Sequence, residues 1–313
     1  MPQRGVCPVA EKANFEIRES NQWVADPSNA NFQSKHRPGL YQCNECREQF
    51  TVTVKTVFER SKVPLSKWLA ALFLLTASKK GVSAHQVHRS LAVSYKTAWF
   101  MMHRLREALR NGDFFPFGQG GGEVEADETF IGRVKGTKVR QGVHHKNAVL
   151  SLIDRDTKQV RSFHVDQANA ENVAPIVSAN ISKEAHLQTD QAKYYRTIGK
   201  TAARHETVDH SEEEYVRYVS DPETGEEYTI HTNTLEGYFS LFKRGMKGVY
   251  QHCGEKHLHR YLAEFDFRYN NRVAHGITDY MRAEIAAKGI VGKCLTYRRP
   301  HGAPYANDNQ TPL

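Results

Sequence analysis

Long apolar runs are missing from this sequence of 313 residues. The longest candidate, residues 68–75, falls far short of the roughly 18–20 apolar residues that a membrane-spanning helix needs. The first ten residues lack the apolar core of a signal peptide. Cysteine is scarce, and its odd count of five argues against a disulfide-stapled secreted fold. We therefore expect a cytoplasmic protein with no membrane segment.

Glycine-rich phosphate-binding motifs are missing as well. Neither GxGxxG nor GxxxxGK[ST] occurs, so nothing in the sequence indicates nucleotide binding. Acidic residues are outnumbered, because 43 Lys and Arg face 35 Asp and Glu and give a net charge of +8. Such a basic balance is compatible with a polyanionic partner, since each neutralised phosphate releases condensed counterions.

The cysteines that are present suggest a metal site near the N-terminus. Cys43 and Cys46 form a CxxC pair, and thiolates at that spacing can both face one tetrahedral Zn²⁺ ion. A second pair is incomplete, because Ala10 stands where a partner for Cys7 would be. Residues 1–50 are therefore an incomplete zinc-ribbon-like segment, or a small loop-rich domain that binds no metal.

Residues 61–110 carry three helical patterns. Ser83 and Ser94 are placed to cap the second and third helices, with a tight turn at residues 92–94 between them. A short helix, a three-residue turn and a longer helix are typical of helix-turn-helix DNA binding. The alternative is a plain three-helix bundle with a solvated basic face. We assign residues 51–110 to this all-α domain, with Lys96, His103, Arg104 and Arg110 as candidates for DNA contact.

A Pro- and Gly-containing linker at residues 111–122 leads to a region with different periodicity. Three strand-like runs follow closely, as three antiparallel strands joined by short connections would. A helix and a short strand come next, which predicts a mixed α/β domain over residues 123–275. Its expected elements are strands at 123–131, 148–153 and 159–165, a helix at 171–181, a strand at 186–189 and helices within 233–272. Residues 276–313 are assigned to a C-terminal tail.

Three acidic residues stand out by their context. Asp127 lies inside a predicted strand, where aspartate is disfavoured unless it has a partner such as a metal ion. Asp190 ends a strand and Glu236 opens a helix, so the three carboxylates can converge if the two strands are neighbours. Carboxylates suit hard cations such as Mg²⁺, and two such ions can activate an attacking oxygen and stabilise a leaving one. Taken singly, each acid could equally be a solvated or turn carboxylate.

Other charged residues surround these three in the sequence. Glu125 and Glu128 are alternative candidates for the metal-binding role of Asp127. On a regular strand only Glu125 lies on the same face as Asp127. Lys243 follows Glu236 by two helical turns, so both point the same way and the lysine could grip a phosphate. The basic, aromatic-rich segment at 233–272 adds Arg244 and Lys247 as candidates for DNA contact.

Four stretches in this order carry a family resemblance: EADETFIG, LQTDQAKYY, HTNTLEGYFSLFKRGMKGVY and HLHRYLAEFDFRYNNR. They resemble the DDE transposases of bacterial insertion sequences, and within that group the ISXO2-like branch. That branch has a zinc ribbon and a helix-turn-helix ahead of an RNase H-like core. By this resemblance, Asp127 and Asp190 match the two aspartates of the motif, and Glu236 and Lys243 match its glutamate and lysine. Some relatives have asparagine as the third member, for which Asn233 is the candidate.

The resemblance implies a function as well as a fold. It implies binding to terminal inverted repeats in double-stranded DNA, cleavage that gives a 3′-hydroxyl, and attack of that hydroxyl on target DNA. It also implies Mg²⁺ or Mn²⁺ and a homo-oligomer that synapses two transposon ends. Two other interpretations stay open, a decayed remnant or regulator that only binds DNA, and a metal-dependent nuclease that cleaves without joining.

Overall fold

A computed structural model describes residues 40–42, 49–51, 53–110, 115–139, 141–208, 216–220, 227–293 and 295. The chain divides into two compact units, Met1–Val54 and Lys55–Leu313. In the first unit, strands β1 (Leu40–Gln42) and β2 (Gln49–Thr51) form an antiparallel pair. The expected zinc ligands Cys7, Cys43 and Cys46 lie outside the described residues, so zinc binding stays a prediction.

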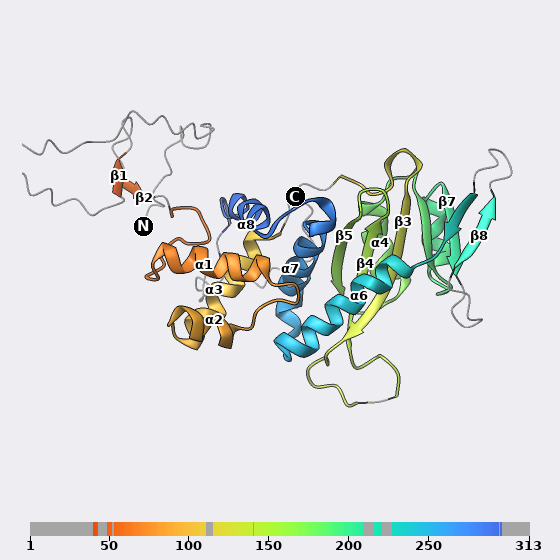
Figure 1. Cartoon of the computed structure of the whole chain (residues 1–313). Helices are drawn as coiled ribbons and strands as arrows, with labels where there is room; N and C mark the ends of the chain where they lie inside the picture. The colour runs from red at the N-terminus through yellow and green to blue at the C-terminus, as the bar shows by residue number, and fades with distance from the viewer. Residues whose placement is uncertain are drawn as a thin grey trace, which may run out of the picture. The chain divides into compact units, whose positions relative to one another are not determined.

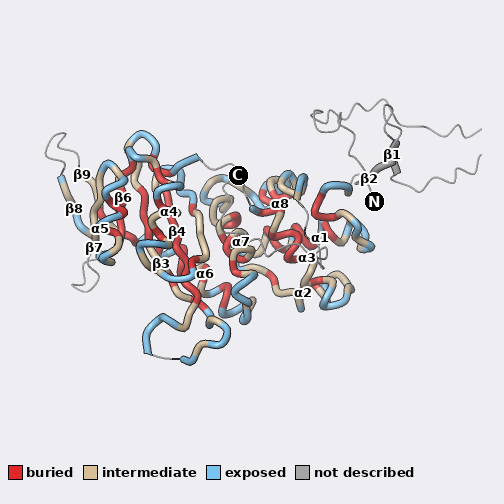
Figure 2. Tube along the Cα trace, turned by 180° about the vertical axis from the view of Figure 1, so that it is seen from behind, coloured by how far each residue is buried: buried red, intermediate tan, exposed pale blue. Residues whose placement is uncertain are grey.

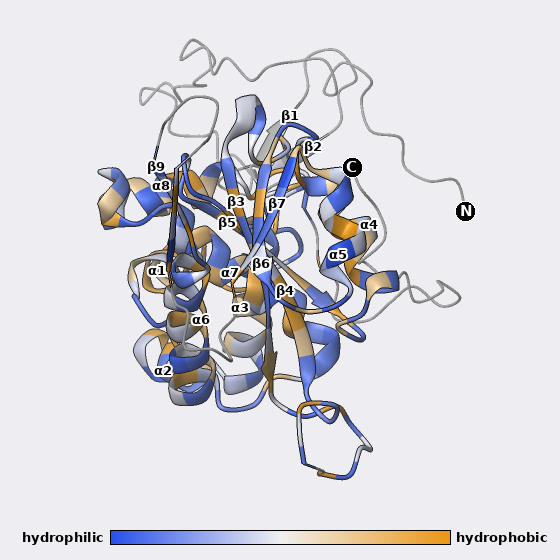
Figure 3. Ribbon diagram, turned by 90° about the vertical axis from the view of Figure 1, so that its right-hand side faces the viewer, coloured by the Kyte–Doolittle hydropathy of each residue, from blue (hydrophilic) through white to orange (hydrophobic). Residues whose placement is uncertain are grey.

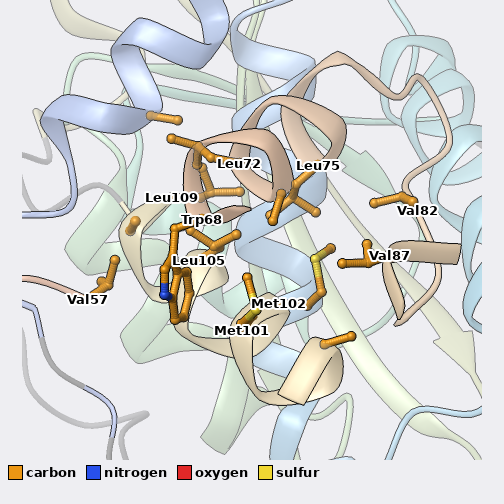
Figure 4. Close-up of a cluster of buried hydrophobic side chains, with 14 of the residues drawn as sticks. Val57, Trp68, Leu72, Leu75, Val82, Val87, Met101, Met102, Leu105 and Leu109 are labelled. Atoms are coloured by element: carbon orange, nitrogen blue, oxygen red, sulfur yellow. The ribbon is translucent and has the colours of Figure 1, made fainter. Parts of the chain in front are cut away.

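Three helices open the second unit: α1 (Leu65–Ala77), α2 (Ala84–Leu91) and α3 (Tyr95–Ala108). Both predicted caps are confirmed, because the Ser83 hydroxyl accepts from the Gln86 amide at 3.2 Å and the Ser94 hydroxyl accepts from the Thr97 amide at 3.1 Å. Apolar side chains at helical spacing then meet in one core. Figure 4 shows this cluster, which includes Trp68, Leu72, Leu75, Val87, Met101, Met102 and Leu105.

A five-stranded sheet forms the centre of the rest of the unit, in the order β5-β4-β3-β6-β7. Strand β3 pairs antiparallel with β4, and β4 pairs antiparallel with β5, as expected. Strands β6 and β7 run parallel to β3. This order and these directions fit an RNase H-like core. The strands are β3 (Glu123–Ile131), β4 (Asn147–Asp154), β5 (Gln159–Val165), β6 (His186–Asp190) and β7 (Arg204–Val208).

Helices cover both faces of this sheet (Figure 1). Helices α4 (Ala170–Asn180) and α5 (Tyr195–Ile198) pack on one face, and α6 (Asn233–Gly245) and α7 (Leu258–Asn270) on the other. Strand β4 is buried along its whole length, because its alternate side chains enter the two different cores. Figure 2 shows the central strands as the most buried part of this unit.

Several elements were not expected from the sequence. One connection is long: β3 and β4 are joined by residues 132–146, which corrects the expectation of short connections throughout. Helix α8 (Asp279–Lys288) lies in the stretch assigned to the C-terminal tail, and its Ala286 belongs to the core with α1 and α3. Strands β8 (Arg217–Ser220) and β9 (Glu227–Ile230) form a separate antiparallel pair. Short helical turns occupy Gln119–Gly121, Gly199–Thr201, Met246–Tyr250, Glu255–His257 and Val273–His275.

A buried ion-pair network joins the α1–α3 helices to the sheet domain. Glu264 of α7 is fully buried, and its carboxylate accepts from Nε of Arg106 on α3 at 2.7 Å and from Arg268 on α7. The Tyr250 hydroxyl donates to the same carboxylate. One carboxylate therefore neutralises guanidinium groups from two helices that are more than 150 residues apart in the sequence. Within the described part of the chain, no helix is both long and apolar enough to cross a lipid bilayer.

Candidate functional site

The two aspartates lie side by side because of the sheet register. Strands β3 and β6 are parallel neighbours, and their register pairs Ala126 with Thr189. The next residue on each strand is Asp127 on β3 and Asp190 on β6, so the two side chains occupy adjacent strands at one edge. The Asp127 carboxylate accepts from the Glu128 amide at 2.7 Å, and the Asp190 carboxylate accepts from the Ala192 amide at 3.0 Å.

Glu125 positions the helix that carries Glu236. Glu125 is fully buried, and its carboxylate accepts from the Leu235 amide at 3.0 Å and from the Thr234 hydroxyl at 2.7 Å. These are contacts to the first turn of α6, where unpaired amides favour an anion. Glu125 therefore shares the helix-facing side of β3 with Asp127, as predicted, but its oxygens are engaged in holding α6.

Arg155 also helps to hold the first turn of α6 in place, a role that the sequence did not predict. Its guanidinium donates to Glu125 at 2.7 Å, to Gln188 at 2.6 Å and to the His231 carbonyl at 2.7 Å. It thus links β3, β6 and the segment that enters α6. Nothing in the sequence marks Arg155 for this role, because its partners lie 30 to 76 residues away.

Glu128 points to the opposite face of β3, also as predicted. Its carboxylate accepts hydrogen bonds from the hydroxyls of Tyr194, at 2.8 Å, and Tyr195. Burial and the nearby Asp190 charge raise the pKa of Glu128 to about 7, although the two tyrosine hydrogen bonds act against this shift. Glu128 is therefore held in place beside the aspartates. The sequence pattern predicted it only as an alternative candidate to Asp127.

A cavity of about 800 Å³ opens over these carboxylates. Asp127, Glu128 and Glu236 lie on one part of its lining. Toward the end of α6 and in the turn that follows it, the lining becomes basic, with Lys243, Arg244 and Lys247. The Lys243 ammonium lies 6.0 Å from the centre of the Phe239 ring, which also lines the cavity. Asn233, the alternative third member, is not among the lining residues.

The carboxylates of this site repel one another electrostatically. Burial, together with the charges of Glu128, Asp190 and Glu236, raises the pKa of Asp127 to about 8. Asp127, Asp190 and Glu236 therefore lie within electrostatic reach of one another. In the part of the chain that the structure describes, no three His, Cys, Asp or Glu side chains are close enough to hold a metal ion. The three acids thus share a site, but their oxygens are not at ligand distances from one common point.

The raised pKa of Asp127 predicts a stabilising substitution. The folded pKa of about 8 exceeds the ordinary 3.8, so between these pH values the folded protein binds one more proton than the unfolded chain. The contribution of Asp127 to the free energy of unfolding is therefore full below pH 3.8 and is lost as the pH rises through 8. In metal-free buffer, Asp127→Asn should raise this free energy, and by more at pH 8 than at pH 5. Urea unfolding of wild type, Asp127→Asn and the exposed control Asp166→Asn measures this, and an equal difference at both pH values would contradict it.

Two of the four candidates for DNA contact on α3 and just after it are misassigned. His103 is 1% exposed and packs against the rings of Trp99 and His257. Arg104 is 5% exposed and donates to the Glu59 carbonyl at 2.9 Å. Helix α3 contacts α1 and α2 as well as α7, so more than one of its sides is covered. Lys96 and Arg110 are exposed, as DNA contact requires.

The fold and site together define an α/β domain that fits the RNase H-like class, with acidic residues from β3 and α6 lining one cavity. Asp190 of β6 does not line this cavity but lies close enough for its charge to act on Asp127. Residues 119–270 match the family model described as the ISXO2-like transposase domain. Residues 119–270 therefore form an ISXO2-like transposase domain, which confirms the family resemblance of the sequence.

Two individual proteins are also similar. An uncharacterised protein in transposable element ISH50 of Halobacterium salinarum is 27% identical over 244 residues, which cover 73% of this chain and 77% of that protein. A chain in the cryo-EM structure of the simian T-cell lymphotropic virus intasome with PP2A regulatory subunit B56 gamma is 13% identical. That match covers 57% of this chain and 67% of the other, and its TM-score of 0.28 is too low to support an argument.

Proposed function

We propose that this chain is an active insertion-sequence transposase, which binds terminal inverted repeats and catalyses metal-dependent DNA cleavage and strand transfer. The observation that carries the proposal is the cavity in which Asp127 and Glu236 face the basic side chains of the same helix, α6. A phosphodiester needs both kinds of group, because cations bind its oxygens while carboxylates bind the metal ions that polarise it.

Asp127, Asp190 and Glu236 are the residues that would hold Mg²⁺ or Mn²⁺. Their chemistry fits, because carboxylate oxygens are the ligands that these hard cations prefer. The mutual repulsion that raises the pKa of Asp127 also fits, since a cation would relieve it. When bound, two such ions supply activation of the attacking oxygen and stabilisation of the leaving one.

The remaining residues have binding and positioning roles in this proposal. Lys243, Arg244 and Lys247 bind phosphate oxygens of the strand that lies in the cavity. Glu125 and Arg155 fix the first turn of α6, and thereby the position of Glu236. The exposed Lys96 of α3 and Arg110, which follows this helix, contact the transposon end, and a homo-oligomer brings two ends together. The division into domains at 51–110 and 123–275 is part of the same proposal.

The test is a strand-joining assay with the full chain, a labelled transposon-end duplex, a target duplex and Mg²⁺. The proposal expects metal-dependent cleavage at the end, followed by a joined product. Cleavage without joining would indicate the metal-dependent nuclease. Binding of the end without any chemistry would indicate the decayed remnant or regulator.

The identity of the third carboxylate is tested by a pair of substitutions. Glu236→Gln should lower the joining rate at least about a hundredfold, because a neutral amide is a poor ligand for Mg²⁺. Asn233→Ala should leave the rate within about threefold, since Glu236 and not Asn233 lines the cavity and contributes a charge that acts on Asp127. Single-turnover joining with both variants measures this. The reverse pattern would move the role from Glu236 to Asn233.

A further inference from the structure

The connection between β3 and β4 projects beyond the carboxylates. Strand β6 ends at Asp190, beside Asp127, whereas β3 and β4 stay paired as far as Ile131 and Asn147. The hairpin therefore continues from Asp127 to Ile131, about 13 Å at roughly 3.3 Å per residue, before its loop begins. Figure 3 shows this loop protruding from the end of the two strands. We call residues 132–146 the basic arm.

The charge of the basic arm has one sign. Its sequence, GRVKGTKVRQGVHHK, contains five Lys and Arg, two His, and no Asp or Glu. Among the described residues, Arg133, Lys135 and Lys138 are exposed. A protruding basic segment without acidic neighbours in its own sequence creates a positive potential, which favours a polyanion.

Hydrogen bonds within the arm give it a defined shape. The Val134 amide donates to the His145 carbonyl at 2.9 Å, and the Lys146 amide donates to the Val143 carbonyl at 2.9 Å. Arg133 donates from Nε to the Thr137 carbonyl at 3.0 Å. The side chains of Lys135 and Lys138 are exposed at the surface. The arm is thus a braced extension of the hairpin that presents lysines.

We infer that the basic arm binds the phosphates of DNA that extends past the carboxylates, without reading its sequence. The inference rests on the proposed function, because it places a duplex in the cavity between the arm and the basic side chains of α6. Lysines on a loop neutralise phosphates, and such contacts supply the part of the affinity that does not depend on sequence. The arm therefore holds target DNA, whereas the transposon end is recognised elsewhere.

The test compares two double charge-reversal variants, one at each end of the strands of the sheet. K135E/K138E alters the arm. K158E/K183E is the matched control, because Lys158 lies in the β4–β5 turn and Lys183 lies three residues before the start of β6, both at the end of the sheet away from Asp190. Binding of the full chain to a labelled duplex of random sequence is measured by fluorescence anisotropy at several salt concentrations without Mg²⁺. The neutral variant K135Q/K138Q provides a second form of the arm, and circular dichroism verifies folding.

The arm variant should bind the random duplex at least about tenfold more weakly, and the slope of log K against log salt should fall by about 2. The neutral variant should shift in the same direction by less, and the control should match wild type. Unchanged affinity and slope in the arm variant would overturn the inference, as would an equal loss in the control. These binding measurements do not depend on catalysis. A catalytically inactive wild type would therefore contradict the proposed function and leave the binding result unaffected.

Discussion

Asp127→Asn is expected to lower the rate of end cleavage and joining at least about a thousandfold while leaving end binding within about twofold. The substitution keeps the size of the side chain but removes a charged metal ligand, and metal ions contribute several kcal/mol to such reactions. Binding should survive, because Asp127 carries no positive charge and lies apart from the exposed basic residues of α3. The measurement is single-turnover cleavage with Mg²⁺, alongside anisotropy with the end duplex.

The matched control for Asp127 is Asp166→Asn. Asp166 directly follows β5, which places it at the same edge of the sheet but two strands from Asp127. It is exposed and does not line the cavity. Its substitution should leave cleavage unchanged. Retained cleavage in Asp127→Asn would remove that residue from the chemistry.

Glu264→Gln is expected to destabilise the fold by about 3–5 kcal/mol, because it leaves the buried guanidiniums of Arg106 and Arg268 without their counter-charge. Burial alone would raise the pKa of Glu264, but the charges of Arg268 and Arg106 outweigh it and hold this pKa below its ordinary value. Urea unfolding followed by circular dichroism measures the loss. The network joins α3 to α7, so the same variant should separate the unfolding of the helices from that of the sheet.

The control for Glu264→Gln is Glu284→Gln. The Glu284 carboxylate pairs with Lys288 at 3.4 Å, and both side chains are exposed, at 64% and 75%. Surface pairs of this kind contribute little, so the change in the free energy of unfolding should stay within about 0.5 kcal/mol. A similarly small loss in Glu264→Gln would show that the buried network does not stabilise the interface.

Local patterns predicted the elements of the core well. Strand β3 and both serine caps follow from neighbours within a few residues, so the sequence alone contains the necessary information. The adjacency of Asp127 and Asp190 needed one further assumption, that their strands pair, and the sheet confirms it.

Contacts between distant segments were not predictable in this way. The sequence predicts that His103 and Arg104 face DNA, but both are buried. Helix α7, which contacts α3, lies about 150 residues further along the chain. The role of Glu125 was unpredictable for the same reason. Its carboxylate holds the first turn of α6, which lies about 110 residues further along the chain.

Anomalous diffraction from Mn²⁺ tests most directly whether Asp127, Asp190 and Glu236 form one divalent-metal site. Crystals of the full chain with a transposon-end duplex would be grown in Mn²⁺, and data collected at the manganese edge. We expect anomalous peaks between the Asp127 and Asp190 carboxylates, with the Glu236 side chain bound to the same ions. Bound DNA with no manganese at these three residues, or manganese held by other side chains, would contradict it.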